Sequence, residues 1–250
     1  MIFDPRLVFT RIPKILKYLP ITMEIAIGAT LISLIIGFIV ALIKIRKVPV
    51  LHQITAFYVS FTRGTPILVQ LYATYVGIPI ILRLFNAHFG TSFSVNGIPP
   101  IVFALLALSL NDAAYSSEAI RAAIQAVDRG QIEAAHSIGM TTWQTLRRII
   151  IPESLVIALP SLGNAFIGMI KGTSLVFVTA VVEMSTYGRQ LAGRDFRYLE
   201  MYVTLAIIYW VITFVVSKLL NLWERKLKCD ERAAGGGAGR DTAARLTEKV

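Results

Sequence analysis

The chain has 250 residues, of which 55% are hydrophobic and 16% are charged, and its mean hydropathy is +0.65. This composition excludes an ordinary soluble domain and is typical of a protein that crosses the membrane several times. In such a chain, the net charge of +10 indicates basic residues in cytoplasmic loops, close to anionic lipid headgroups. No nucleic-acid-binding signature accompanies this charge. The single cysteine, Cys229, excludes an internal disulfide and a cysteine-based metal site.

The first half of the chain predicts a surface helix and three membrane spans. Residues 1–20 place apolar residues at helical spacing, which predicts an amphipathic helix along the bilayer surface. A first span is predicted over 21–43, long enough to cross a core of roughly 30 Å. A second is predicted over 54–82, kinked or unwound at Pro66, which removes a helix hydrogen bond. A third is predicted over 99–122.

The second half predicts two more spans, over 156–183 and 201–222. Before them lies a polar stretch, 129–152, and after them a tail, 229–250, whose charged residues, alanines and glycines predict disorder. Residues 21–228 are therefore expected to form one all-α membrane domain with five transmembrane helices.

The distribution of basic residues favours one orientation of these spans. Lys44, Arg46 and Lys47 directly follow the first span and end it. The loops that would be cytoplasmic carry twelve basic residues and those outside carry eight. The bias places the N-terminus outside and both the polar stretch and the C-terminus in the cytoplasm.

The polar stretch 129–152 predicts a helix, a tight reversal and a second short helix. Ala134 and Ala135 are small, so another surface can approach the first helix closely, and Glu133 offers one charge for anchoring. Gly139 has no Cβ to oppose the reversal. Pro152 suits the first turn of a following helix, where a missing N–H removes no hydrogen bond.

This stretch resembles the EAA loop of ABC importer permeases. The resemblance rests on Gly130, on Glu133-Ala134-Ala135 followed by Gly139, and on Pro152, with Ile151 where that family usually has Leu. It implies a type I importer-like fold whose coupling helix docks on a separate ATPase subunit. It also implies a second permease copy or homologue, an extracytoplasmic amino-acid-binding protein, and a location in the bacterial plasma membrane. ATP and Mg would be bound by the ATPase, so this chain would need no cofactor.

One polar stripe runs along the third predicted span. Asn111, Tyr115 and Glu118 follow helical spacing, which places them on one face. Arg121 is three residues after Glu118, so the two are in position to pair as the helix leaves the membrane.

The second predicted span contributes Arg63 and Gln70, seven residues apart and on one side of a continuous helix. Beside the break at Pro66 their N–H groups could bind a substrate carboxylate. Arg63 could equally be an interfacial anchor or a packing residue.

The fourth predicted span holds Lys171 near its middle, where a charge costs roughly 2.5–3.5 kcal/mol on insertion scales. Asn164 shares its face, Thr173 and Ser174 follow, and Gly168 and Gly172 would let another helix approach. We expect this face to line the translocation pathway. The alternative is a structural pair between Lys171 and Glu118 or Glu183.

Three further segments extend the resemblance to the polar amino-acid branch of these permeases. They are 63–70, 115–135 and 164–175, so the similarity covers about residues 20–225. Gly172 stands where that branch more often has an acidic residue. Basic amino acids, glutamine or glutamate, cystine and opine-like compounds all remain compatible with the sequence.

Catalytic motifs are absent from the sequence. No Gly precedes a Lys, so there is no phosphate-binding loop, and His52, His88 and His136 have no metal-ligand spacing. We therefore expect a transport subunit rather than an enzyme. A secondary transporter driven by an ion gradient, or a channel, is one alternative, but it leaves 129–152 without a purpose. A membrane sensor or interaction protein built on the same scaffold is another.

Overall fold

The computed structural model describes residues 3–94 and 97–235, with side chains to 227, and every regular element within them is helical. The helices are α1 Pro5–Leu16, α2 Leu19–Arg46, α3 Leu51–Gly64, α4 Ile67–Phe89, α5 Pro100–Gln125, α6 Arg129–Ser137, α7 Thr142–Thr145, α8 Ile151–Gly172, α9 Met184–Asp195 and α10 Tyr198–Gly235, with a π-helical turn Leu146–Ile150 and a 3₁₀ helix Thr173–Thr179.

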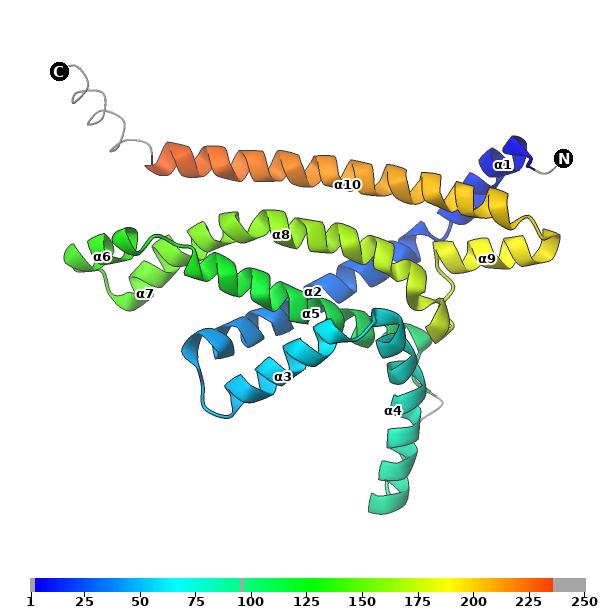
Figure 1. Ribbon diagram of the computed structural model, residues 1–250, viewed down its shortest axis with the longest axis horizontal. Coiled ribbons are helices and arrows are strands. Elements are labelled where there is room, and N and C mark those ends of the chain that lie inside the picture. Colours follow the sequence, from blue (N-terminus) through cyan, green and yellow to red (C-terminus); the bar gives the residue numbers. More distant parts are fainter. Residues whose placement is uncertain (1–2, 95–96, 236–250) are drawn as a thin grey trace.

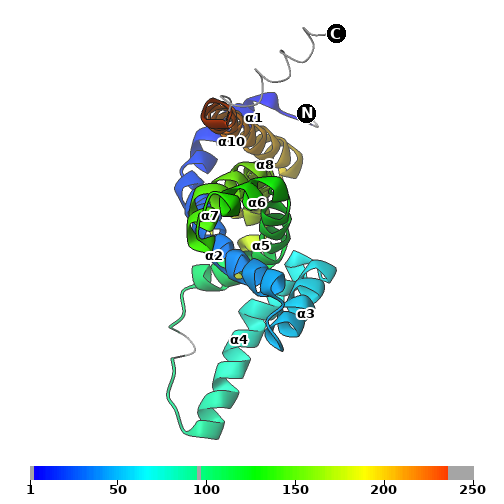
Figure 2. The ribbon, with the colours of Figure 1, turned by 90° about the vertical axis from the view of Figure 1, so that its left-hand side faces the viewer.

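Four long helices, α2, α5, α8 and α10, run roughly along the long axis of the molecule (Figure 1). Seen along that axis, α10 lies over α8, then α2 and α5, then α3, and α4 projects away from the body (Figure 2). The main core joins α2, α5, α8 and the 3₁₀ helix. Helices α2 and α5 approach each other closely, because a Cβ on Gly37 would lie 3.2 Å from the carbonyl oxygen of Ala113.

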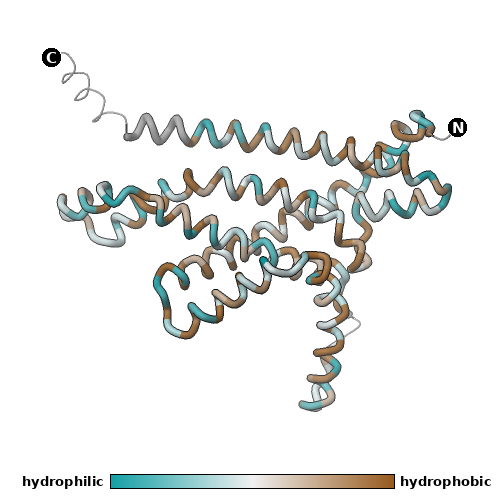
Figure 3. Tube along the Cα trace, in the orientation of Figure 1, coloured by the Kyte–Doolittle hydropathy of each residue, from teal (hydrophilic) through white to brown (hydrophobic). Residues whose placement is uncertain are grey.

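Five helical segments are long and apolar enough to cross a membrane, as the sequence predicts. They are Leu19–Arg46, Ile67–Phe89, Pro100–Gln125, Thr142–Thr179 and Tyr198–Leu227. Hydrophilic residues gather at both ends of the long helices, in α6 and α7 at one end and in α9 at the other (Figure 3).

The second predicted span is two helices rather than one. Helix α3 ends at Gly64, Thr65 and Pro66 are extended, and α4 starts at Ile67. The break at Pro66 is confirmed, and it turns α4 across the direction of α3 (Figure 1). Only α4 is long and apolar enough to count as a span.

Helix α1 packs on protein through one side, and its predicted position along the bilayer surface stays a prediction. Its buried residues Val8, Arg11 and Ile15 face α9 and α10. The Thr204 hydroxyl on α10 donates to the carbonyl of Val8 at 3.3 Å, and Arg11 forms an ion pair with Asp195. Phe9 is exposed on α1, so the helix can pack on protein and still lie at the bilayer surface.

The ends of the last two spans also differ from the prediction. The fourth changes to a 3₁₀ helix at Thr173 and ends at Thr179, short of the predicted 183. Helix α10 continues through 229–235, part of the predicted disordered tail. Lys, Glu, Arg and Ala have high helix propensity, and extending an existing helix needs no new nucleus. The rest of the predicted tail, 236–250, lies outside the described residues.

Candidate functional site

The stretch 129–152 forms a helical hairpin at one end of the molecule (Figure 1). Asp128 caps α6 by accepting from the N–H of Gly130 at 2.9 Å. Gly139 has a positive φ of 83° and provides the reversal, as predicted. Thr141 and Gln144 then cap α7 reciprocally, which is a capping box. The local sequence signals therefore account for this hairpin.

Pro152 is accommodated by a widened turn rather than by a new helix start. Helix α7 leads through the π-helical turn into α8 without a break, and Pro152 is within the first two residues of α8. In the turn, the N–H of Ile151 donates to the carbonyl of Leu146, five residues back. The wider turn leaves room for the ring of Pro152, whose backbone nitrogen has no N–H to donate. The predicted restart is thus a continuous helix.

The outer face of the hairpin is apolar and uncovered. The side chains of Ile138 and Trp143 are 79% and 66% exposed. Glu133 and Ala134 are exposed beside them, whereas Ala135 is buried inside the hairpin. Exposed apolar side chains at the polar end of a membrane protein are typical of a docking surface for another protein. Of the two alanines, Ala134 is the one available to a partner.

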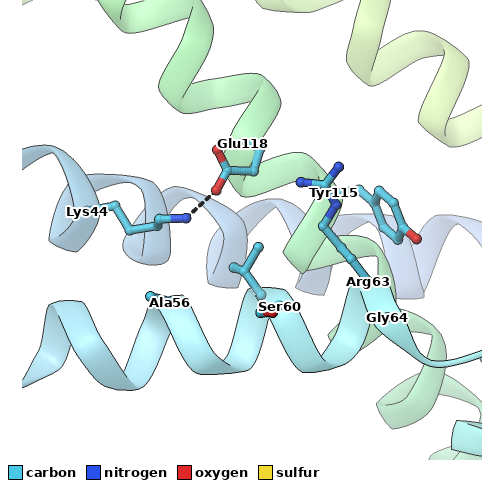
Figure 4. A pocket seen from close by; sticks show the side chains of 8 residues that line it. Lys44, Ala56, Ser60, Arg63, Gly64, Tyr115 and Glu118 are labelled. Atoms are coloured by element: carbon cyan, nitrogen blue, oxygen red, sulfur yellow. Dashed lines mark hydrogen bonds and ion pairs between the residues drawn. The ribbon is translucent and has the colours of Figure 1, made fainter.

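A cleft of about 600 Å³ opens between α2, α3 and α5. Its lining residues are Lys44, Ala56, Val59, Ser60, Arg63, Gly64, Tyr115 and Glu118. Figure 4 shows Lys44 from α2, Arg63 from α3 and Glu118 from α5 approaching one another around it. The structure therefore brings together three residues from the predicted pathway, Arg63, Tyr115 and Glu118.

Glu118 holds an ion-pair cluster at this cleft. Its Oε2 accepts from Nε and Nη2 of Arg121 at 2.9 and 2.7 Å, which confirms the predicted pair. Its Oε1 accepts from Lys44 of α2. Both carboxylate oxygens are thus occupied by cations, and the cluster ties α5 to α2.

Arg63 stacks on an aromatic ring. Its guanidinium carbon lies 5.3 Å from the ring centre of Tyr115, a cation–π contact. Arg63 is twelve residues into α3, or roughly 18 Å along the helix axis. Among the described residues, no acidic side chain pairs with Arg63. Arg63 is exposed on α3, so the N–H groups of its guanidinium remain open to water or to a ligand.

Gln70 is oriented toward the helix break instead of the cleft. Its Nε2 donates to the carbonyls of Thr62 and Thr65 at 2.9 and 3.1 Å and to the Thr65 hydroxyl at 2.7 Å. Its Oε1 accepts from Asn111 at 3.1 Å. These bonds satisfy backbone groups that the Thr65–Pro66 break leaves without helical partners. The structure gives Gln70 and Asn111 a part in holding the break.

The predicted residues of the fourth span lie away from the cleft. Asn164 and Lys171 are exposed on α8, together with Ser161 and Gly168, so they share one face as predicted. Thr173 is buried and donates to the carbonyl of Ile170, and Ser174 donates to that of Lys171.

Lys171 is at the end of α8, in its last turn, and not at the centre of a helix. The predicted structural pair is wrong. Glu118 pairs with Lys44 and Arg121. Glu183 accepts from the hydroxyls of Thr22 and Tyr209. Within the described part of the chain, Lys171 makes no ion pair.

Sequence reasoning missed Lys44 and Ser60 as cleft residues. Lys44 marked the end of the first span by its position before Arg46 and Lys47. Nothing local to the sequence indicates that its side chain reaches Glu118, 74 positions away. A charge directly at the end of a predicted span is the available signal, because such a residue needs water or a polar partner.

Comparisons with known proteins agree with this architecture. The family of binding-protein-dependent transport system inner membrane components matches residues 33–228. The probable amino-acid permease protein YxeN of Bacillus subtilis is 42% identical over 224 residues, 90% of this chain and 96% of that protein. The probable amino-acid ABC transporter permease protein PatM of Vibrio harveyi is 43% identical over 225 residues, with the same coverage of 90% and 96%.

A solved structure has a similar fold. A chain in a crystal structure of an amino acid ABC transporter with histidines superposes with a TM-score of 0.76 at 35% identity, covering 90% of this chain and 100% of that chain. Fold, family match and relatives all describe a membrane-spanning transport subunit. The chain therefore belongs to the family of binding-protein-dependent transport system inner membrane components, the permease subunits of ABC transporters.

Proposed function

We propose that this chain forms, with a second permease copy or homologue, the membrane pathway of an ATP-driven importer of polar amino acids. The relatives reported above support the substrate class, since their names and titles refer to amino acids. The chain belongs to a family of ABC transporter permeases, and no specific observation favours the alternative of a transporter driven by an ion gradient.

The exposed hairpin carries the proposal that a separate ATPase subunit docks here. Ile138 and Trp143 present exposed apolar side chains in the hairpin, where Ala134 and Glu133 are exposed as well. A partner would bury these side chains, and Glu133 would anchor it by charge. ATP and Mg would be bound by that partner, since this chain has no phosphate-binding loop.

The hairpin is rigidly joined to the transport helices. Helices α7 and α8 are continuous, so displacement of the docked hairpin moves α8. The side chain of Gln131 also donates to Glu153 on α8 at 3.3 Å. ATP binding that closes the ATPases would therefore rock the permease halves and alternate access to the pathway.

The remaining partners are assigned by position. The exposed face of α8 with Asn164 and Lys171 would meet the second permease. The opposite end of the molecule, with α1 and α9, would face outside and receive the amino-acid-binding protein. In this arrangement the N-terminus is outside, and the hairpin and C-terminus are cytoplasmic, as the basic residues favour.

The experiment is purification of the chain from its native membrane in mild detergent, followed by mass spectrometry and uptake in liposomes. We expect an ATPase subunit in stoichiometric amount and uptake of an amino acid that requires ATP. A second permease, or its absence, distinguishes a heterodimer from a homodimer. A chain that purifies alone and carries amino acids under an ion gradient without ATP would overturn the proposal.

A further inference from the structure

One carboxylate lies halfway along a membrane-spanning helix without a cationic partner. Asp112 is twelve residues after the start of α5 at Pro100 and thirteen before its end at Gln125. In the parts of the chain that the structure describes, no Lys or Arg side chain forms an ion pair with Asp112. An ionised carboxylate at the centre of a span needs a positive charge to balance it.

Hydroxyl groups from two helices converge on this carboxylate. Oδ2 of Asp112 accepts from Ser33 on α2 at 2.5 Å and from Ser116 on α5 at 3.1 Å. Ser33 is also halfway along its helix, fourteen residues after Leu19 and thirteen before Arg46. Helices α2 and α5 lie side by side (Figure 2). Both serines are buried between them, whereas Asp112 is only partly buried.

The oxygens around Asp112 outnumber the hydrogens available to them. The hydroxyl of Ser33 carries a single hydrogen. Its oxygen nevertheless lies 2.9 Å from the carbonyl oxygen of Thr30 and 2.5 Å from Oδ2 of Asp112. When the carboxylate is ionised, one of these two close oxygen pairs has no hydrogen between its members. A cation bound among these oxygens removes the repulsion between their partial negative charges.

Two more hydroxyls near this cluster are buried without a hydrogen-bond partner. They belong to Thr30 and Ser109. Each precedes Ser33 or Asp112 by three residues, about one helical turn, and so shares its helix face. Buried hydroxyl groups in proteins nearly always have a partner, and an exception requires an explanation. Their oxygens have lone pairs that a cation can use.

We propose that this cluster binds a monovalent cation, Na⁺, between α2 and α5 in the middle of the membrane. Carboxylate, hydroxyl and carbonyl oxygens are the ligands that hard cations prefer. One carboxylate balances one positive charge, whereas Mg²⁺ would leave a net charge in the span and retains several waters. The ligands are Asp112, Ser33, Ser116 and the carbonyl of Thr30, with the hydroxyls of Thr30 and Ser109 beside them.

A bound ion would act on the packing of the two helices. It joins a carboxylate of α5 to a hydroxyl and a carbonyl of α2, and binding to the folded state alone stabilises that state. The inference goes beyond the proposed function, because binding of Na⁺ at this cluster requires neither ATP nor an amino acid.

The test is equilibrium dialysis with radioactive sodium, together with thermal unfolding, on the purified permease and its co-purifying subunits in lipid nanodiscs. NaCl replaces choline chloride at constant ionic strength, so that general screening by salt stays the same. We expect saturable binding of one ion per permease chain and an unfolding midpoint that rises with the concentration of NaCl.

Two variants locate the ion. Asp112→Asn keeps the shape of the side chain and removes its charge, so it should weaken binding of Na⁺ at least about tenfold. Ser33→Ala removes one hydroxyl ligand and should weaken binding about fivefold. The matched controls are Glu24→Gln, at an exposed position of α2, and Ser92→Ala, at an exposed loop position. Both should bind Na⁺ as the wild type does.

The wild type alone can overturn the inference. Absence of saturable binding, with equal unfolding midpoints in NaCl and choline chloride, would mean that Asp112 is protonated and donates to Ser33 instead of binding an ion. Undiminished binding in folded Asp112→Asn would place the ion elsewhere and would overturn the inference as well. If Asp112→Asn does not fold, Ser33→Ala decides in the same way.

Discussion

Asn111 on α5 donates through its side-chain amide to Oε1 of Gln70 on α4, at 3.1 Å, beside the break between α3 and α4. Gln70 in turn donates to the carbonyls of Thr62 and Thr65, which the break deprives of helical partners. A pair that the sequence suggests as substrate ligands thus also holds an irregular backbone segment to the neighbouring helix.

Replacing Gln70 by Leu should destabilise the protein. The change leaves carbonyls of Thr62 and Thr65 without a donor, and an unsatisfied buried polar group costs about 1–3 kcal/mol. The free energy of unfolding should fall by this amount in a denaturation experiment in detergent. Gln53→Leu, at an exposed position of α3, is the matched control and should change it little. Equal stability of both variants would mean that water satisfies the break without Gln70.

The reversal at Gly139 should depend on backbone conformation more than on side-chain size. Its φ of 83° is unfavourable for residues with a Cβ, yet nothing lies within 4 Å of where that Cβ would be. In the isolated chain, Gly139→Ala and Gly139→Trp should both cost about 1–2 kcal/mol, and Gly139→Asn less.

The same variants separate folding from docking. In the assembled transporter, Gly139→Trp should uncouple ATP hydrolysis from uptake, whereas Gly139→Asn should retain coupling. Hydrolysis and uptake measured in the same liposomes give the ratio. Normal coupling in the Trp variant would show that the turn lies outside the docking surface.

Gly37 and Gly168 should respond differently to Leu. A side chain at Gly37 would meet backbone atoms of Ala113 and Ser117 on α5 at 3.2 Å, so overpacking should cost about 1–3 kcal/mol. Gly168 is exposed with nothing within 4 Å, and Gly168→Leu should leave the stability of the isolated chain within about 0.5 kcal/mol.

Association of two permeases provides the second readout for Gly168. If the face with Lys171 meets the partner permease, Gly168→Leu should reduce the fraction of paired permeases in cross-linking or light scattering. Unchanged pairing would place the partner on another face.

The ion pair between Arg11 and Asp195 should make stability depend on pH in the acid range. Burial opposes ionisation of Asp195, but the backbone N–H of Arg197 and the Arg11 guanidinium outweigh it and hold the pKa of the carboxyl below its usual value. A lowered pKa in the folded state adds stability above the unfolded pKa of about 3.9, and this stability is lost as pH falls below it.

The measurement is the difference in unfolding free energy between the wild type and Asp195→Asn. Because Asp195 is 48% exposed, screening by solvent limits the difference to about 1 kcal/mol or less. It should be constant from pH 7 to pH 5 and shrink below about pH 4. Glu24→Gln, at an exposed position of α2, serves as control. A difference that grows on acidification would contradict the assigned ion pair.

The sequence by itself determined the features that depend on neighbouring residues. Five apolar segments, the break at Pro66, the reversal at Gly139 and the Glu118–Arg121 pair all follow from spacing, proline and glycine geometry within a few positions. The hairpin 129–152 was also identified from its local pattern, and the family match agrees with the function inferred from it.

Only the tertiary structure decided which distant residues meet. Lys44 reaches Glu118 because α2 and α5 pack closely at Gly37, and α1 packs against α9 and α10. Lys171 is exposed in the last turn of α8, just before the fourth span changes to a 3₁₀ helix at Thr173. An apolar or charged residue on a helix predicts that its side chain has a partner. Packing between segments far apart in the chain decides which surface supplies that partner.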